Sequence, residues 1–236
     1  MPADKLDLST FLLSSIHDMK NSLGMMAAYL EDALAEPVSA DNPVDAPARQ
    51  KTAQALYEAQ RVNNHLIQLL ALYKIDQAFY PFDPQERPLA DLAREALARA
   101  QALADSKGIV LDSECPEDLY AWIDYELVFG VVVQALHNAL HYTRSRVLLS
   151  AAAQESGVVI RIEDDGPGFP DFLLAQGNAA QRGISFETGS TGLGLYFADV
   201  VARLHKAGGE TGPITGRIRL ENGGRLGGGC FILELP

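Results

Sequence analysis

The chain has 236 residues, 47% hydrophobic and 21% charged, a composition typical of one or two globular domains with a real core. Its formal net charge of −12 argues against binding to nucleic acids or anionic membranes, since no cluster of Lys and Arg offsets it. Two widely separated cysteines exclude a disulfide framework and a cysteine-rich zinc site. The N-terminus lacks an apolar signal core and no apolar run reaches the roughly 18 residues of a membrane span, so we expect a cytoplasmic protein without membrane insertion.

Residues 1–80 are predicted to form a helical hairpin. In the first helix, 6–36, apolar residues recur every three or four positions, the spacing of a bundle helix, at Leu12, Ile16, Met19, Leu23, Met26 and Leu30. A stretch rich in Pro and Asp ends this helix. The second helix, 46–78, carries a similar stripe of Ala55, Ala59, Val62, Leu66, Leu69 and Tyr73. Neither stripe can be buried fully against one partner helix, so we predict a homodimer in which two antiparallel hairpins form a four-helix bundle.

The remainder of the chain is predicted to be a separate α+β domain. The stretch 81–88, with its three prolines, is typical of a domain linker. Helices are expected over 89–106 and 125–143 and again up to about 205. Strands are expected over 108–115, 119–124, 146–154, 157–165, 216–224 and 228–236. These elements predict, for 89–236, an α/β sandwich in which helices cover one face of a mixed sheet, with Trp122 in the core.

Three stretches of this second domain carry groups suited to a nucleotide. Asn138, in an apolar helix, offers a carboxamide oxygen of the hard kind that Mg²⁺ prefers. Asp164 directly follows a strand, where a fixed carboxylate can accept a hydrogen bond from an exocyclic amine. Gly166 and Gly168 then let the backbone approach a flat base. "GSTGLGL", residues 189–195, places glycines at a helix N-terminus, which suits a phosphate.

Taken together and in this order, "LHNALHYT", "DDGPGF" and "GSTGLGL" resemble the N box and the two glycine boxes of sensor histidine kinases, within the superfamily shared with gyrase and MutL. "HDMKNSL" resembles the H box of their dimerisation and phosphotransfer hairpin. The resemblance implies that ATP and Mg²⁺ bind, with Asn138 holding the metal and Asp164 reading the adenine amino group. It also implies a lid over 170–188 and nucleotide contacts from Gln134, His141, Tyr142, Gly166, Gly168, Gly192, Leu193 and Gly194.

His17 follows the stripe residue Ile16, so it is rotated roughly 100° from the buried face and another domain can reach it. A neutral imidazole can attack the γ-phosphorus of ATP, and Asp18 can hold the proton on its other ring nitrogen. Asn21 shares the face of His17 and can orient a water for a phosphatase reaction. The resemblance thus implies a histidine kinase that autophosphorylates His17 and phosphorylates an Asp of a response regulator receiver domain, with input from a separate sensory protein.

Some positions depart from the family pattern. Asp18 stands where Glu is commoner, Gln134 where Asn is frequent, and His141 where Lys often contacts phosphate. Two alternatives therefore stay open: a relay protein that carries phosphate on His17 without hydrolysing ATP, and a regulatory partner of another kinase. His137 and His141 are spaced to share a metal, but we interpret them as helix-face residues near the nucleotide.

Overall fold

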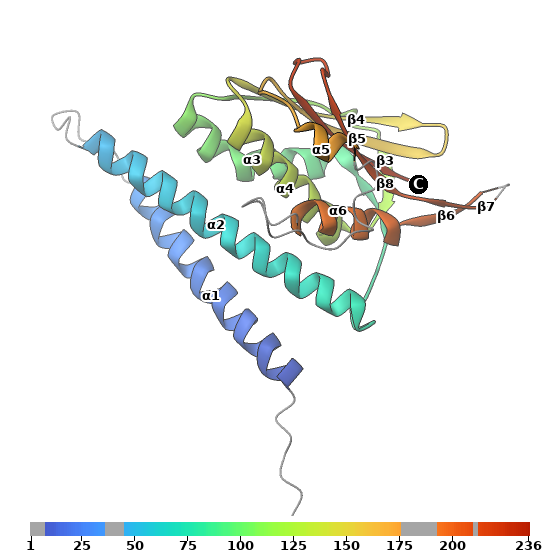
Figure 1. The fold of residues 1–236 in the computed structure, drawn as a ribbon, viewed down its shortest axis with the longest axis horizontal. Helices are drawn as coiled ribbons and strands as arrows, with labels where there is room; N and C mark the ends of the chain where they lie inside the picture. Colours follow the sequence, from blue (N-terminus) through green and yellow to red (C-terminus); the bar gives the residue numbers. More distant parts are fainter. Residues whose placement is uncertain (1–7, 36–44, 176–192, 210–211) are drawn as a thin grey trace, which may run out of the picture. The chain divides into compact units, whose positions relative to one another are not determined.

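The computed structural model describes residues 8–35, 45–175, 193–209 and 212–236. The chain divides into two compact units, 1–80 and 81–236 (Figure 1). The sequence stretch that carries His17 lies in the first unit, and the three nucleotide-related stretches lie in the second.

The first unit is a hairpin of two helices that lie side by side, α1 (Leu8–Ala35) and α2 (Asp45–Asp76). Gln60 Nε2 donates to Glu31 Oε1 at 3.0 Å, which links the two helices. Among the side chains that are described, the buried apolar ones are few and mostly small: Ala27, Leu56, Ala59 and Ala71. Several members of the predicted stripes are exposed in this single chain, namely Met19, Met26, Val62 and Leu69. The four-helix bundle stays a prediction.

The second unit is built on a five-stranded sheet with the strand order β2-β4-β5-β9-β8. Its strands are β2 (Val110–Glu114), β4 (Arg146–Gln154), β5 (Gly157–Asp164), β8 (Arg217–Asn222) and β9 (Gly229–Leu235). β2 and β4 run parallel, and every other neighbouring pair is antiparallel. The sheet is therefore mixed, as predicted.

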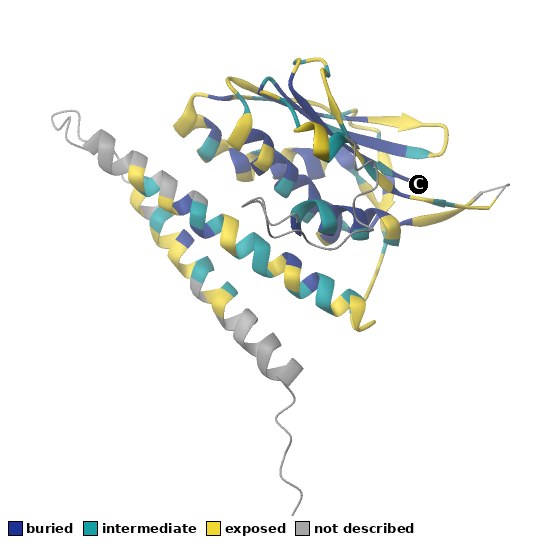
Figure 2. Cartoon of the chain, in the orientation of Figure 1, coloured by how far each residue is buried: buried dark blue, intermediate teal, exposed yellow. Residues whose placement is uncertain are grey.

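One face of this sheet is covered by α3 (Leu89–Lys107), α4 (Tyr125–Tyr142) and α6 (Leu193–Leu204) (Figure 1). α4 contacts β4 and β5, whereas α6 contacts β8 and β9. Both layers contribute side chains to the core, which is dark blue in Figure 2. Its fully buried members include Leu136, Leu140, Leu149, Ile160, Ile162 and Leu233. The predicted α+β architecture with helices on one face is confirmed.

Side-chain caps fix the ends of α4 and α6 relative to each other. Asp124 precedes α4, and its Oδ1 accepts the N–H of Leu127 at 3.2 Å. His205 follows α6; its Nε2 accepts the N–H of Asp124 at 3.0 Å, and its Nδ1 lies 2.8 Å from the carbonyl oxygen of Val201. Nδ1 therefore carries the proton. Burial lowers the pKa of His205, so the ring stays neutral and joins the two helices.

Some elements differ from the prediction. The last residues of the expected linker form β1 (Gln85–Pro88), which pairs with β3 (Tyr120–Ile123) in a two-stranded ribbon that tolerates the missing N–H of proline. Side chains alternate along β3, so Ile123 is buried whereas Trp122 is 65% exposed. The prediction of Trp122 as a core residue was wrong, because only one face of this ribbon packs on the unit. Small elements that we did not predict are α5 (Asp171–Ala175) and the pair of β6 (Lys206–Gly209) and β7 (Gly212–Thr215).

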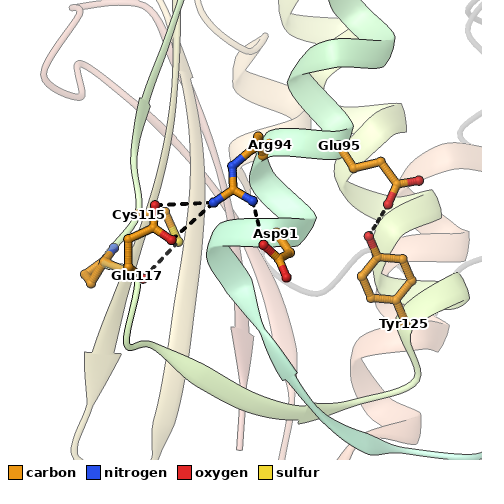
Figure 3. A network of polar contacts seen from close by, with 7 residues as sticks. Asp91, Arg94, Glu95, Cys115, Glu117 and Tyr125 are labelled. Atoms are coloured by element: carbon orange, nitrogen blue, oxygen red, sulfur yellow. Dashed lines mark hydrogen bonds and ion pairs between the residues drawn. The ribbon is translucent and has the colours of Figure 1, made fainter.

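A polar network fastens α3 to its neighbours (Figure 3). Arg94 bridges Asp91, in the first turn of α3, at 2.6 Å and Glu117, in the β2–β3 connection, at 3.1 Å. Tyr125, the first residue of α4, donates a hydrogen bond to Glu95; burial and this bond raise the pKa of Tyr125. Exposed ion pairs of this kind add little to the free energy of unfolding. We therefore infer that the network serves to orient α3.

Candidate nucleotide site

Asp164 is the last residue of β5 and lies on the face of the sheet that the helices cover. It is 7% exposed. Its Oδ1 accepts the N–H of Gly166 at 2.7 Å and that of Gly229 at 3.2 Å, so the carboxylate has a fixed orientation. Burial raises the pKa of Asp164, with a smaller contribution from the charge of Asp165, and the two backbone bonds oppose this rise. No residue that the structure describes donates a hydrogen bond to Oδ2, which can therefore accept one from a ligand.

The glycines after Asp164 are required by the chain's own packing. A Cβ on Gly166 would lie 2.4 Å from the carbonyl oxygen of Tyr142, at the end of α4. Gly168 has φ = +82°, a conformation that favours glycine, and its Cβ would lie 2.7 Å from Oδ1 of Asn222. Asn222 in turn accepts the N–H of Phe169 at 2.7 Å and donates to its carbonyl oxygen at 2.9 Å. The loop that bears the predicted base site is thus held between α4 and β8.

The acids on either side of Asp164 each fasten another loop, which we did not predict. Asp165 accepts the N–H groups of Arg144 at 2.8 Å and Ser145 at 2.9 Å, and the hydroxyls of Thr143 and Ser145. Although desolvation acts in the opposite direction, these bonds together lower the pKa of Asp165. On the other side, Glu163 is 3% exposed and accepts hydrogen bonds from the β8–β9 turn. The acidic run "EDD" marks these acids in the sequence. It does not reveal which loops they hold, because their partners lie far along the chain.

A second group of predicted residues meets where α4 faces α6. Gln134 and Asn138 lie one turn apart on α4, and Gln134 Nε2 is 3.2 Å from Asn138 Oδ1. Gly194, in the first turn of α6, packs against Gln134: a Cβ there would lie 3.1 Å from its Cγ. Leu193 is buried. Gln134, Asn138 and Gly194 line a small hollow between the two helices, together with Val131, Ala135, Leu195, Ala198 and Phe231.

The last turn of α4 lies between the loop around Asp164 and the hollow lined by Gln134 and Asn138. Tyr142, 58% exposed, meets Gly166 through its backbone, and its ring stands edge-on to that of His141, with 4.8 Å between the centroids. His141 is exposed, whereas His137 is 5% exposed and faces the core. Because the side chains of His137 and His141 differ so much in exposure, they do not form a shared metal site. Gly192 and residues 176–188 of the predicted lid lie outside the described residues.

The predicted phosphotransfer residues belong to the other unit. His17, Asp18 and Asn21 all lie within α1. The side chain of Asn21 is exposed, and those of His17 and Asp18 fall outside the description. Their roles stay predictions.

The residues near the hollow fit a magnesium ion. Among the residues that the structure describes, no group of three or more His, Cys, Asp or Glu side chains could hold a metal. Mg²⁺ does not need such a group in a nucleotide site, because phosphate oxygens and water supply most of its ligands and one or two protein oxygens complete the shell. The amide oxygen of Asn138, on the wall of the hollow, is a ligand of this kind.

Residues 123–236 match the family described as histidine kinase-, DNA gyrase B-, and HSP90-like ATPases. The chain is 25% identical, over 97% of its length, to sensor histidine kinase TmoS of Ectopseudomonas mendocina and covers 23% of that protein. It is 26% identical, over 96% of its length, to sensor histidine kinase RppB of Synechocystis sp. and covers 48% of that protein. It thus spans a quarter to a half of these curated relatives.

Solved structures have the same fold. The catalytic domain of histidine kinase ThkA, 23% identical, aligns with a TM-score of 0.53 over 65% of this chain and 95% of that one. The ATP-binding domain of PrrB from Mycobacterium tuberculosis, 26% identical, aligns with a TM-score of 0.50 over 65% of this chain and 97% of that one. The C-terminal unit therefore has the fold of these domains, and the curated relatives that the chain matches are sensor histidine kinases. Among the described helices, none is both long and apolar enough to cross a membrane.

Proposed function

We propose that this chain is an ATP-dependent histidine kinase that autophosphorylates His17 and then phosphorylates an Asp of a response regulator receiver domain. The observation that carries the proposal is the orientation of Asp164. Two backbone N–H groups occupy its Oδ1, while Oδ2 receives no hydrogen bond from a described residue. A buried carboxylate held in this way recognises a ligand that donates a hydrogen bond, as the amino group of adenine does.

The remaining site residues have complementary roles in this proposal. Asn138 holds Mg²⁺, which neutralises charge on the phosphates when it is bound, and Gln134 orients the Asn138 amide. Tyr142 and His141 flank the nucleotide, and the backbone N–H groups of Gly192, Leu193 and Gly194 bind the phosphates. The imidazole of His17 forms a bond to the γ-phosphorus while the bond to the β–γ bridging oxygen breaks and ADP leaves. Asp18 accepts the proton of the other ring nitrogen.

The hairpin is proposed to act as a homodimer. Met19 and Met26 of α1 and Val62 and Leu69 of α2 are exposed in the single chain, and burying them between two hairpins would form the core of a four-helix bundle. We further propose that Asn21 orients the water that dephosphorylates the response regulator, and that a separate sensory protein supplies the input in the cytoplasm.

The proposal is tested by incubating the purified protein with Mg²⁺ and ATP labelled at the γ-phosphate. We expect the protein to acquire a label that is lost in acid, because a phosphorylated imidazole is labile in acid. The label should be absent from His17→Gln and reduced in Asn138→Asp, and it should persist in the matched control His65→Gln, which alters the other histidine of the hairpin. An acid-labile label that survives His17→Gln would rule out this phosphorylation site. Nucleotide binding without any label would instead favour a regulatory partner.

A further inference from the structure

The turn between β8 and β9 rests on the buried acid Glu163. Oε1 of Glu163 accepts the backbone N–H of Arg225 at 2.7 Å, and Oε2 accepts Nε of the same residue at 3.3 Å. A Cβ on Gly224 would lie 2.4 Å from Oε1, so the backbone of the turn lies directly against the carboxylate. Arg225 also reaches β2, because its Nη1 donates to Glu114 Oε2 at 2.8 Å. One guanidinium thus ties the turn to both β5 and β2.

The same turn orients Asp164. The N–H of Gly228 donates to the carbonyl oxygen of Asp164 at 3.0 Å, and the N–H of Gly229 donates to its Oδ1. The sequence of the turn, "NGGRLGGG", is dominated by glycine, which has little conformational preference of its own. An external anchor is therefore needed to hold these N–H groups in place, and the charged pair of Arg225 with Glu163 is such an anchor.

Arg225 does not reach the base site itself. Successive side chains of a strand point to opposite faces of a sheet, so Glu163 and Asp164 lie on opposite faces of β5. Asp164 lies on the helix-covered face, and Arg225 binds Glu163 on the other. Any effect of Arg225 on a nucleotide must therefore pass through the turn and the N–H groups that it presents to Asp164.

We propose that Arg225 is a positioning residue for base recognition, which acts by holding the β8–β9 turn on Glu163 so that Gly228 and Gly229 fix the Asp164 carboxylate. This inference rests on the proposed role of Asp164 as the group that binds the amino group of adenine. It predicts that Arg225 influences which base is preferred, although it touches no base.

The test compares the affinities for ADP and for inosine diphosphate, which carries an oxygen in place of the amino group, by calorimetric titration of the full chain. A loss of Asp164 orientation lowers the ratio of the two affinities, whereas general destabilisation weakens both equally. We expect Arg225→Ala to lower this ratio by about tenfold, as for the loss of one hydrogen bond to a charged group. Arg225→Lys should recover part of it, since an ammonium can pair with Glu163, but its single nitrogen cannot reproduce the separate contacts of Nε with Glu163 and Nη1 with Glu114.

The matched control is Arg217→Ala. Arg217 is an exposed arginine at the other end of the same hairpin, paired with Glu234. Arg217→Ala should leave the ratio of the two affinities unchanged. A wild-type ratio in Arg225→Ala would overturn this inference and leave the proposed function intact. A wild-type protein that does not prefer ADP would overturn both.

Discussion

The backbone N–H of Gly229 donates a 3.2 Å hydrogen bond to Oδ1 of Asp164, across 65 positions of sequence. The N–H of Gly166, only two positions away, donates to the same oxygen at 2.7 Å. A donor from the far end of the chain and a local donor thus select one carboxylate oxygen and leave the other for a ligand. This division between the two oxygens determines what a substitution at Asp164 does.

Asp164→Asn should weaken ADP binding by tenfold or more, on the order of 1.4 kcal/mol for each factor of ten. The two N–H donors will hold the amide oxygen in the position of Oδ1, which turns the NH₂ group toward the adenine amine. Two donors then face each other, and a hydrogen bond to a charged acceptor is lost. Calorimetric titration measures the change. Asp118→Asn, which removes the same charge from an exposed position, should bind like the wild type, and an unchanged affinity in Asp164→Asn would contradict the assignment.

Gly166→Ala should destabilise the C-terminal unit by about 1–3 kcal/mol, because the added methyl group meets the carbonyl oxygen of Tyr142 at 2.4 Å and the backbone must move. Urea unfolding followed by circular dichroism measures the free energy of unfolding. The control is Gly208→Ala: no atom lies within 4 Å of that Cβ position, so we expect a far smaller effect. Equal losses in the two variants would show that the close approach of Tyr142 is not the cause.

The stability of the C-terminal unit should fall between pH 6.5 and pH 4. Burial, with a contribution from the charge of Arg99, lowers the pKa of His137 to about 4. The unfolded chain binds a proton at this position near pH 6.5 and the folded chain does not, so acid favours unfolding by up to about 3 kcal/mol across this range. Urea unfolding at pH 7 and pH 5 measures the slope.

His137→Gln should reduce this pH dependence, and buried His205, whose pKa is also lowered by burial, accounts for a remainder of the same sign. His141→Gln is the matched control for the loss of an imidazole, since His141 is exposed on the same helix. A slope that His137→Gln does not reduce would contradict the prediction.

Trp122 and Ile123 should respond in opposite ways to truncation. Trp122 is 65% exposed, so Trp122→Ala should change the free energy of unfolding by no more than about 0.5 kcal/mol. Ile123 is 0% exposed, so Ile123→Ala should cost about 2–5 kcal/mol through lost burial and the cavity that remains. Thermal or urea unfolding of the two variants tests both expectations. A large loss of stability in Trp122→Ala would mean that the exposed face of Trp122 is covered in solution.

Most of the secondary structure of the C-terminal unit could be predicted, because its signals are local. The helix at 125–142 shows as an apolar run after the capping residue Asp124, and the strands at 146–154 and 157–164 are separated by a short turn. The mixed sheet with helices on one face followed from these elements and was confirmed. The roles of the site residues stay predictions.

Features that depend on distant pairing could not be predicted. Trp122 is exposed because β3 pairs only with β1, a strand hidden in a proline-containing stretch taken for a linker. In the sequence, Glu163 and Asp165 are simply acids at the end of a strand. Their partners Arg225 and Ser145 lie on loops whose positions are determined only by the folded sheet. Gly166 was linked to a ligand, whereas its nearest neighbour is the backbone of Tyr142.

The pleat of β5 places its last two acids, Glu163 and Asp164, on opposite faces of the sheet. In the observed register Glu163 lies opposite Cys230 and Asp164 opposite Val147. A slip of one residue would turn Glu163 toward the helices and Asp164 toward the guanidinium. A single insertion or deletion within this strand would therefore exchange the faces that Glu163 and Asp164 occupy, although both acids were still present in the sequence.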